Sequence, residues 1–393
     1  MAKQLRVGLV GVGQRGLNHL QQLVRLQSEE IGTFAALADP FADNLNPDKI
    51  KQYEPNYDDR GMSLFSTADD MIASGEVDVI WFAMPPNQHR GEIERAAEAG
   101  IAVFAEKPQT LFFDEALSQA EAIDNAGIPN TVGFLMRFHP AYKAIRDHLS
   151  DKWTAAMMMV AEGAVEGHGV KHTHTEEAGG PANRIWTANR AWSGTSMVEA
   201  GIHQTDIMRY WSDDDVEWVR ASYVERPENL WATEGDNPIY YNVTYGFKKG
   251  AIGTLVFTKP ARSYYNGRFD CVIWEHGTIK FEGNRVVDYH YPGDDWTPAL
   301  RPGIEDTRHV ICEDPGYDGM AIPNTYQLAK TFLESIIDND ETLTRNTYRS
   351  SLNSLAAVLA ANTSNHLNGQ QINIQEFMHA DQYAKYRTRP KNS

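Results

Sequence analysis

The sequence is poor in cysteine, short of basic residues and without a long apolar run, and each shortage excludes a class of protein. Only two of its 393 residues are cysteines, Cys271 and Cys312, and their spacing is not that of a metal-binding pair. We therefore expect a reducing cytoplasm. Lysine and arginine total 36 against 53 acidic residues, a formal charge of −17, which disfavours nucleic acid or an anionic membrane as partner. No stretch approaches the roughly 18 consecutive apolar residues of a membrane span, and the first residues show no secretory signal.

Five short apolar runs occupy the first third of the chain: Leu5–Gly11, Thr33–Ala38, Val77–Met84, Ile101–Ala105 and Thr131–Met136. They are nearly continuous rather than alternating, which is typical of strands covered on both faces. Helical patterns fill the intervals between them. This alternation predicts an α/β fold with a parallel, doubly wound sheet.

The first apolar run ends in "GVGQRG", which fits the pattern G-x-G-x-x-G between a predicted strand and a predicted helix. A second strand ends at Asp39, 23 residues past the last glycine. This arrangement predicts a dinucleotide site in which a carboxylate accepts hydrogen bonds from the ribose and repels a 2′-phosphate, so NAD is favoured over NADP. The loop arginine argues mildly for NADP, and a turn residue before Pro40 is the alternative for Asp39. The predicted cofactor residues here are Gly11, Val12, Gly13, Gln14, Arg15, Gly16 and Asp39.

The second half of the chain has a different pattern. Strand-like segments, several with period-two alternation, follow one another through short turns, which predicts an antiparallel sheet. Helical patterns return after residue 320. We expect a nucleotide-binding domain over residues 1–137 and a substrate and oligomerisation domain over residues 138–393, whose late helices pack back on the first. We expect the ligand to lie between the two domains. The last residues, "RTRPKNS", are expected to form a frayed basic tail.

Four stretches resemble the Gfo/Idh/MocA-type oxidoreductases: "GLVGVGQRG", "AMPPNQHRGEIERAAEAGIAVFAEKP", "VGFLMRFHPAYKAI" and "VEAGIHQTDIMRYW". Their order and spacing agree with that family over nearly the whole chain. The resemblance implies an NAD-binding Rossmann domain followed by an antiparallel-sheet domain like that of glyceraldehyde-phosphate dehydrogenase. It also implies a carbohydrate substrate and a homodimer or homotetramer formed through the exposed sheet face, where "IYYNVTYGF" would supply apolar contact.

The resemblance implies a role for three residues. Lys107 of the Glu-Lys-Pro motif would project toward nicotinamide and substrate, where an ammonium stabilises developing charge on oxygen. His203 would take the hydroxyl proton. Glu199 replaces the family's usual aspartate, so its role stays open between orienting His203, binding a substrate hydroxyl and reshaping the pocket. A cis bond before Pro108 is also expected. A solvated loop lysine and a structural helix histidine are the alternatives.

Further cofactor contacts are predicted at Pro85, Asn87, His89, Glu106 and Arg137. The "PPNQHR" stretch would lie beside the nicotinamide ribose, and its alternative is a proline-stiffened helix start capped by Asn87. Arg137 would face the cleft or, nearly as readily, form a surface ion pair.

The polar segment 166–194 is predicted to shape the substrate side through His168, Trp186, Arg190 and Trp192, together with Lys107, Glu199 and His203 from the catalytic set. Indole faces suit a pyranose and guanidinium groups suit hydroxyls or an anionic substituent; a core-packed tryptophan pair with surface arginines is the alternative. His168, His172, His174, Glu176 and Glu177 have no spacing that forces them to converge, so no metal site is expected.

Three functions remain. The first is an NAD-dependent dehydrogenase acting on a secondary hydroxyl of a sugar, polyol or sugar derivative. The second is a glycosidase, possibly for an anionic sugar, that uses NAD transiently and needs further acid/base groups, for which His168, His174, Tyr264 and Tyr265 are available. The third is a nucleotide-sensing or scaffold protein, which would need neither Lys107 nor His203.

Overall fold

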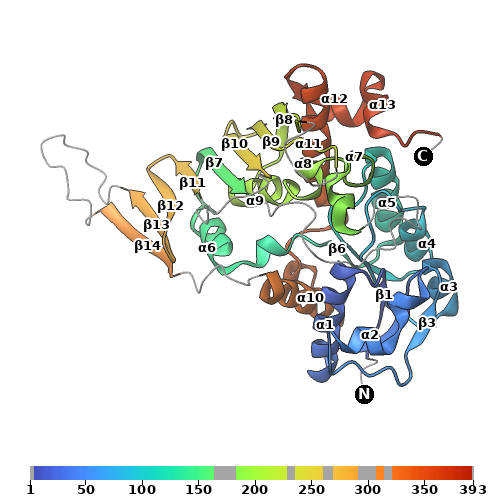
Figure 1. Ribbon diagram of the computed structural model, residues 1–393. Coiled ribbons are helices and arrows are strands. Elements are labelled where there is room, and N and C mark those ends of the chain that lie inside the picture. The colour runs from blue at the N-terminus through green and yellow to red at the C-terminus, as the bar shows by residue number, and fades with distance from the viewer. Residues whose placement is uncertain are drawn as a thin grey trace, which may run out of the picture.

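The computed structural model describes residues 4–162, 183–227, 235–259, 269–290, 307–313 and 321–391. Figure 1 shows two sheets: the first, with its helices, forms one end of the molecule, and the second extends from it to a narrow end at β12, β13 and β14. No helix of these ranges is long and apolar enough to cross a membrane.

The first sheet has six strands in the order β3-β2-β1-β4-β5-β6, and every neighbouring pair is parallel. The doubly wound parallel sheet is therefore confirmed. The order reverses between β1 and β4, and at such a point the carboxyl ends of the strands open a crevice for ligand. The strands are β1 (Arg6–Val10), β2 (Thr33–Ala38), β3 (Ser63–Phe65), β4 (Val79–Phe82), β5 (Ala102–Ala105) and β6 (Asn130–Val132).

Helices cover both faces of this sheet, which is why all residues of β4 and β5 are buried. The helices of this part of the chain are α1 (Gln14–Ser28), η1 (Ala42–Leu45), α2 (Pro47–Lys51), α3 (Ala68–Ser74), α4 (Glu92–Glu98), α5 (Phe113–Ala126), η2 (Leu135–Phe138) and α6 (Pro140–His148).

The second sheet has nine strands in the order β14-β13-β12-β11-β7-β10-β9-β8-β15. It is antiparallel as predicted, with one exception: β7 and β10 run parallel. A long connection that includes the helices η3, α7, α8 and α9 separates β7 from the β8–β9–β10 meander that returns beside it. The strands are β7 (Thr154–Glu162), β8 (Val216–Val224), β9 (Tyr240–Phe247), β10 (Ile252–Thr258), β11 (Phe269–Trp274), β12 (Gly277–Glu282), β13 (Arg285–His290), β14 (Arg308–Glu313) and β15 (Ile372–Asn373).

The remaining helices join the two sheets. They are η3 (Asn183–Ala188), α7 (Arg190–Ser193), α8 (Ser196–Glu199), α9 (Ile202–Ser212), α10 (Ala321–Asp338), η5 (Glu341–Leu343), α11 (Tyr348–His366), α12 (Ile374–His379), η6 (Asp381–Tyr383) and α13 (Ala384–Arg387). Late helix α10 packs against α1, and its Phe332 ring lies 5.5 Å from the Trp81 ring of β4. Helix α11 is buried on most sides because it lies between β8 and α5.

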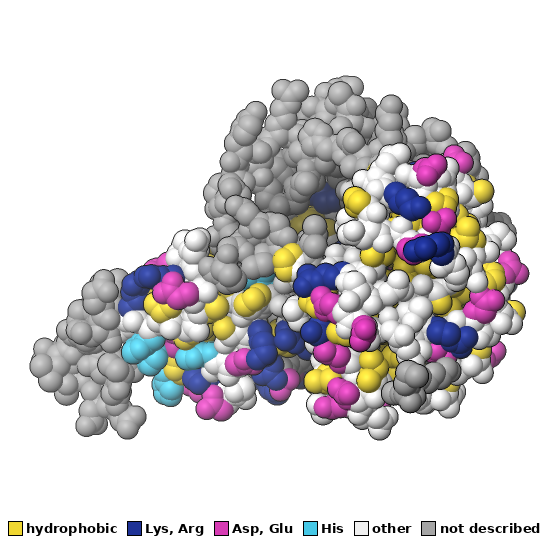
Figure 2. Space-filling view, turned by 90° about the horizontal axis from the view of Figure 1, so that it is seen from below, with side chains coloured by type: hydrophobic (Ala, Val, Ile, Leu, Met, Phe, Trp, Pro, Cys, Tyr) yellow, Lys and Arg dark blue, Asp and Glu magenta, His cyan; other side chains and the backbone are white. Residues whose placement is uncertain are grey.

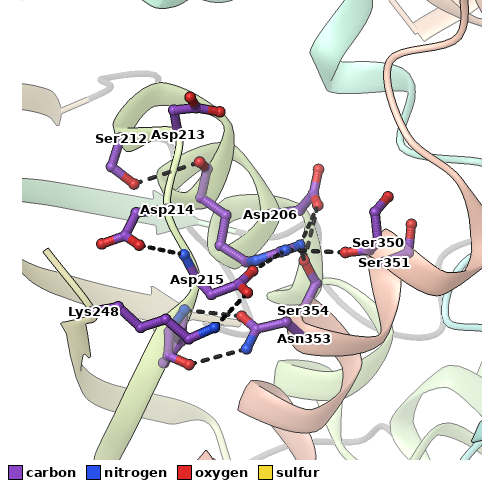
Figure 3. Close-up of polar contacts among 12 residues, drawn as sticks. Asp206, Ser212, Asp213, Asp214, Asp215, Lys248, Ser350, Ser351, Asn353 and Ser354 are labelled. Atoms are coloured by element: carbon purple, nitrogen blue, oxygen red, sulfur yellow. Dashed lines mark hydrogen bonds and ion pairs between the residues drawn. The ribbon is translucent and has the colours of Figure 1, made fainter.

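A buried polar network fixes helix α9, which carries His203. Arg137 of η2 donates from Nε and Nη2 to the two Asp206 carboxylate oxygens at 2.7 and 2.8 Å. Ser354 of α11 donates to Asp206 at 2.8 Å, and Figure 3 shows Asp206 pointing toward this helix. Arg209, also on α9, donates to Ser354 of α11 at 2.8 Å and to Asp215 in the turn after α9. Charged groups buried in this way are satisfied only in one relative position of the helices.

The outward face of the second sheet carries exposed apolar side chains. Val160, Ile252 and Phe269 are 38–47% exposed, and Val160 and Phe269 are neighbours across β7 and β11. In the "IYYNVTYGF" strand, which was expected to supply this face, Tyr240 is half-buried, whereas Tyr241 and Tyr245 are buried in the core. The two-residue side-chain period of β9 turns these aromatic rings inward.

The C-terminal tail is not frayed as expected over its described part. Arg387 is only 9% exposed and both Arg387 and Arg389 form ion pairs with helix α5.

At the opposite, narrow end of the molecule histidines gather (Figure 2), and His148 and His290 both contact the buried Asp288 carboxylate. Within the described ranges no three His, Cys, Asp or Glu side chains are arranged to hold a metal ion.

Candidate functional site

A cavity of about 630 Å³ opens at the carboxyl ends of β1, β2 and β4, where the strand order reverses. Its wall includes Gly11 and Gly13 after β1, Asp39 after β2 and Pro85 after β4. We call it the nucleotide cavity. Loops after adjacent parallel strands meet here because all of these strands end at the same edge of the sheet.

The three motif glycines serve different needs of this turn. A Cβ on Gly11, whose φ is +87°, would lie 2.6 Å from the Ala83 carbonyl oxygen, and one on Gly16 would lie 1.9 Å from the Gly11 oxygen. Both glycines are therefore required by close backbone packing. A Cβ on Gly13 would meet no atom within 4 Å, so the backbone at the start of α1 faces open space. This cradle fits a pyrophosphate placed against a helix N-terminus.

Asp39 is buried and oriented by its own loop. Its Oδ2 accepts a hydrogen bond from the Val12 amide at 2.8 Å, and its Oδ1 accepts from the Phe41 amide and the Asn44 side chain at 2.9 and 3.1 Å. A carboxylate has about four acceptor positions, so one remains for a ribose hydroxyl. The position of Asp39 in the cavity wall fits the predicted preference for NAD.

Trp192 was expected on the substrate side, but the structure places it in the wall of the nucleotide cavity. It belongs to α7, which contacts the segment after β4: the side-chain nitrogen of Asn87 lies 3.5 Å from the Ala191 backbone oxygen. The second half of the chain thus contributes an indole to the nucleotide cavity. A sequence pattern that assigns whole segments to one ligand could not have shown this.

A second cavity of about 320 Å³ shares Gly13, Ala83, Met84 and Pro85 with the first. We call it the substrate cavity. Its wall combines residues from the segment after β5, the start of α1 and helices η3, α8 and α9. Among them are Gln14, Arg15, Asn18, Glu106, Lys107, Trp186, Thr187, Glu199 and His203. The three predicted catalytic residues are therefore brought to one cavity, which shares four wall residues with the nucleotide cavity.

Lys107 and Glu199 form the polar centre of the substrate cavity. The Lys107 ammonium donates to the Glu199 backbone oxygen at 2.8 Å and lies 3.4 Å from its Oε1. Burial raises the pKa of the Glu199 carboxyl, but the Lys107 ammonium, together with Lys259 and His203, outweighs burial and brings that pKa to about 2. The peptide bond between Lys107 and Pro108 is cis, as expected from the family resemblance.

His203 lies beside this pair without a hydrogen bond to the Glu199 carboxylate. Its Nδ1 is buried and has no partner among the described residues, and its ring meets Phe134 edge-on at 6.4 Å. Burial, followed by the Lys107 ammonium, lowers the pKa of His203 to about 3, against the carboxylates of Glu106 and Glu199. The imidazole is therefore neutral and able to accept a proton, while Glu199 faces Lys107.

Glu106 is the centre of a buried network beneath Lys107. Its Oε1 accepts from Arg15 Nε at 2.6 Å and from His19 Nε2 at 2.7 Å, and its Oε2 accepts from the Lys107 amide at 3.0 Å. Burial raises the pKa of Glu106, but Arg15 and His19 hold it well below its usual range. A Cβ on Gly133 would lie 2.9 Å from this carboxylate, so glycine is needed there. Arg15 is thus engaged away from the ribose of a dinucleotide.

Several predicted residues lie outside both cavities. Arg137 is bonded to Asp206, and Arg190 is bonded to Asp236 and Glu225. His89 is buried against Glu92, and the side-chain nitrogen of Asn87 contacts the Ala191 oxygen of α7. Residues His168, His172, His174, Glu176, Glu177, Tyr264 and Tyr265 lie outside the described ranges, and nothing about their predicted roles follows from the structure.

Sequence reasoning missed His19, Asn18, Asn44 and Thr187. His19 follows the glycine motif by three residues on α1, but its partner Glu106 is 87 residues away in the chain. Polar side chains on the sheet-facing side of a predicted helix are the signal that could have found it.

Comparisons with known proteins agree with this geometry. Residues 5–134 match the model described as an oxidoreductase family with an NAD-binding Rossmann fold, and residues 154–280 match the GFO/IDH/MocA C-terminal domain. The rhizopine catabolism protein MocA of Rhizobium meliloti is 30% identical over 53% of this chain and 57% of its own length. The inositol 2-dehydrogenase of Corynebacterium glutamicum is 28% identical over 45% of this chain and 50% of its own length. The chain thus aligns with about half the length of each of these relatives.

The fold is also that of a solved structure, the scyllo-inositol dehydrogenase from Lactobacillus casei with bound NAD(H) and scyllo-inositol. The TM-score is 0.70 at 17% identity, over 95% of this chain and 100% of that one. At this identity the likeness shows the arrangement of the two domains and leaves the reaction to be argued from the site.

Proposed function

Because the chain belongs to the GFO/IDH/MocA oxidoreductase family, whose two models together match more than half of it, we propose that it is an NAD-dependent dehydrogenase. Its substrate is a sugar or polyol of the inositol type, oxidised at a secondary hydroxyl. The observation that carries this proposal is the meeting of Lys107, Glu199 and His203 in one cavity that adjoins the nucleotide cavity and shares four wall residues with it.

The residues that would hold NAD are those of the nucleotide cavity. The open backbone at Gly13 takes the pyrophosphate, Asp39 takes the adenosine ribose, and Trp192 and Pro85 close the apolar wall. When bound, the nicotinamide supplies a hydride acceptor. The two cavities meet at Gly13, Ala83, Met84 and Pro85, which is where that acceptor must face the substrate.

The proton of the reacting hydroxyl is assigned to His203. Burial and Lys107 lower the pKa of His203 to about 3 and so keep the imidazole neutral before the reaction. The same low pKa makes it a weak base, so the proton transfer depends on stabilisation of the alkoxide by Lys107. Lys107 donates a hydrogen bond to the same oxygen and stabilises the negative charge that develops as the proton leaves. Glu199 holds the ammonium in place through its carbonyl and carboxylate.

The charges of the substrate cavity favour a neutral polyol over an anionic sugar. Glu106 offsets Arg15 and Glu199 offsets Lys107, so no cation is left over for an anionic substituent among these side chains. Arg190, which was expected to suit a carboxylated sugar, is paired elsewhere. The names of the relatives, inositol 2-dehydrogenase and scyllo-inositol 2-dehydrogenase, support the same choice.

The other functions receive less support. The glycosidase alternative depends on acid/base groups such as His168 and Tyr264 that lie outside the described residues. A scaffold would not need the half-buried ion pair of Lys107 with Glu199. We further infer a homo-oligomer formed through the exposed apolar face around Val160 and Phe269, and a cytoplasmic location, since neither cysteine is in a disulfide.

The test is the absorbance of reduced nicotinamide after the protein is mixed with NAD and a panel of inositols, sugars, sugar acids and nitrophenyl glycosides. Polyol-dependent NADH formation is the expected result. NAD-dependent release of nitrophenol without accumulating NADH would contradict the proposal and indicate the glycosidase. NAD binding with no turnover of any kind would favour the scaffold.

A further inference from the structure

The last described residues cross the beginning of α5 and reach the segment after β4. We call residues 387–389 the C-terminal strap and residues 85–91 the cofactor loop. Figure 1 shows α12 and α13, from which the strap continues, beside α5 at the edge of the first domain. The two segments are about 300 residues apart in the chain, so their contact is a feature of the fold alone.

The strap is anchored before it reaches the loop. Arg387 donates from Nη1 to the Ala380 oxygen at 2.6 Å and from Nε to Asp114 at 2.8 Å. Thr388 donates to the same Asp114 carboxylate. Arg387 is 9% exposed, so this part of the strap is held by α12 and α5 without any contribution from the cofactor loop.

Arg389 makes the contact with the loop. Its guanidinium forms a two-pronged ion pair with Glu115, with Nη2 at 2.9 Å from Oε2, and lies 4.2 Å from the centre of the Phe112 ring. The same group donates to the Asn87 oxygen at 3.1 Å and to the His89 oxygen at 3.2 Å. One side chain thus joins α5 to two carbonyl groups of the cofactor loop through four hydrogen bonds, one more than the three donors of an ammonium could make.

The loop that Arg389 holds is part of the nucleotide cavity. Pro85, Gln88 and Arg90 line that cavity. Arg90 donates to the same two carbonyl oxygens, of Asn87 and His89, at 2.8 and 2.7 Å. Loss of Arg389 therefore leaves Arg90 to bond these two carbonyl oxygens alone, and removes the hydrogen bonds that join them to Glu115 of α5.

We propose that Arg389 is a positioning residue for NAD: the C-terminal strap holds the cofactor loop in the form that receives the dinucleotide. A loop ordered before binding does not have to lose that conformational freedom when the ligand arrives. The strap touches neither cavity, so its effect is on cofactor affinity and not on the chemical step. This inference rests on the assignment of the cavity to NAD.

The experiment compares two truncated chains, one lacking residues 390–393 and one lacking residues 389–393, which differ only in Arg389. Titration with NAD, followed by tryptophan fluorescence because Trp192 lines the cavity, gives the dissociation constant. We expect the shorter chain to bind about tenfold more weakly, or about 1.4 kcal/mol, and the longer one to match the full chain. The variant Arg389→Lys should fall between them.

The kinetic constants separate positioning from general damage to the fold. The KM for NAD should rise in the shorter chain, whereas kcat at saturating NAD and the KM for polyol should stay within about twofold of the full chain. Equal NAD affinity of the two truncated chains would overturn the proposal, as would a fall in kcat with unchanged affinity. If the full chain itself fails to bind NAD, the cofactor assignment has failed instead.

Discussion

The nucleotide cavity and the substrate cavity share one edge of the first sheet but are built differently. The nucleotide cavity depends on backbone shape, namely the turn at Gly11 and the open position at Gly13. The substrate cavity depends on charged side chains, Lys107, Glu199 and Glu106, that offset one another in a buried setting. The difference indicates a division between the two cavities. Filling the open space of the nucleotide cavity should weaken cofactor binding, and removing a charge from the substrate cavity should lower turnover.

The largest effect is expected from removal of the Lys107 charge. Lys107→Met keeps the chain length but leaves the substrate oxygen without its hydrogen-bond donor, and we expect kcat to fall by about 10²–10⁴-fold. Affinity for NAD should change by no more than about threefold, because Lys107 lines the substrate cavity alone. Steady-state kinetics and an NAD titration measure the two quantities. Retained kcat would show that the lysine is not part of the reaction.

A smaller effect, on NAD affinity rather than on turnover, is expected when a side chain fills the open space at Gly13. Gly13 has φ −75°, so Gly13→Val introduces no backbone strain, and no atom lies within 4 Å of the new Cβ. The side chain would occupy the space assigned to the pyrophosphate, and we expect NAD to bind about 30-fold more weakly or worse. The melting temperature without NAD should not change, which separates this result from misfolding.

Asp39→Asn should alter the choice of cofactor more than the affinity for it. The amide keeps one acceptor oxygen for the loop but removes the charge that repels a 2′-phosphate. We expect the preference for NAD over NADP, as a ratio of kcat/KM, to fall by about tenfold. Asp43→Asn, at an exposed neighbouring carboxylate, is the matched control and should leave the ratio unchanged.

The smallest expected effect is that of pH, because kcat/KM should stay constant while His203 remains deprotonated. A general base works in its deprotonated form, which is populated above its pKa. Burial and Lys107 lower the pKa of His203 to about 3, so its titration should not reduce kcat/KM between about pH 8 and pH 5. Lys107→Met removes one of the lowering charges and should raise the pKa of His203, measured by NMR of the imidazole. A wild-type imidazole that titrates near its ordinary value would contradict this description of the site.

The parts of the fold that could be predicted are those that depend on local sequence patterns, such as an apolar run or a glycine motif. The apolar run Val77–Met84 became the buried strand β4, and "GVGQRG" became the turn into α1, because strand burial and a glycine turn depend on neighbouring residues. The catalytic set was predicted through resemblance to a family, and its meeting in one cavity agrees with that reading.

The parts that could not be predicted are long-range pairings of side chains. Arg137 was expected near the cofactor but is bonded to Asp206, and the tail expected to fray is bonded to α5 through Arg387 and Arg389. Glu199 was open between several roles because its partner Lys107 is 92 residues away. A spacing in sequence limits which residues share one helix or strand, but not which elements meet.

The most direct test of the division between the two cavities sets Lys107→Met beside Gly13→Val and measures two quantities for each, the dissociation constant of NAD and kcat at saturating NAD and polyol. We expect near-normal affinity with lost turnover for Lys107→Met, and weakened affinity with turnover largely recovered at saturation for Gly13→Val. If both variants lose affinity and turnover together, the cavities act as one unit and the division is wrong.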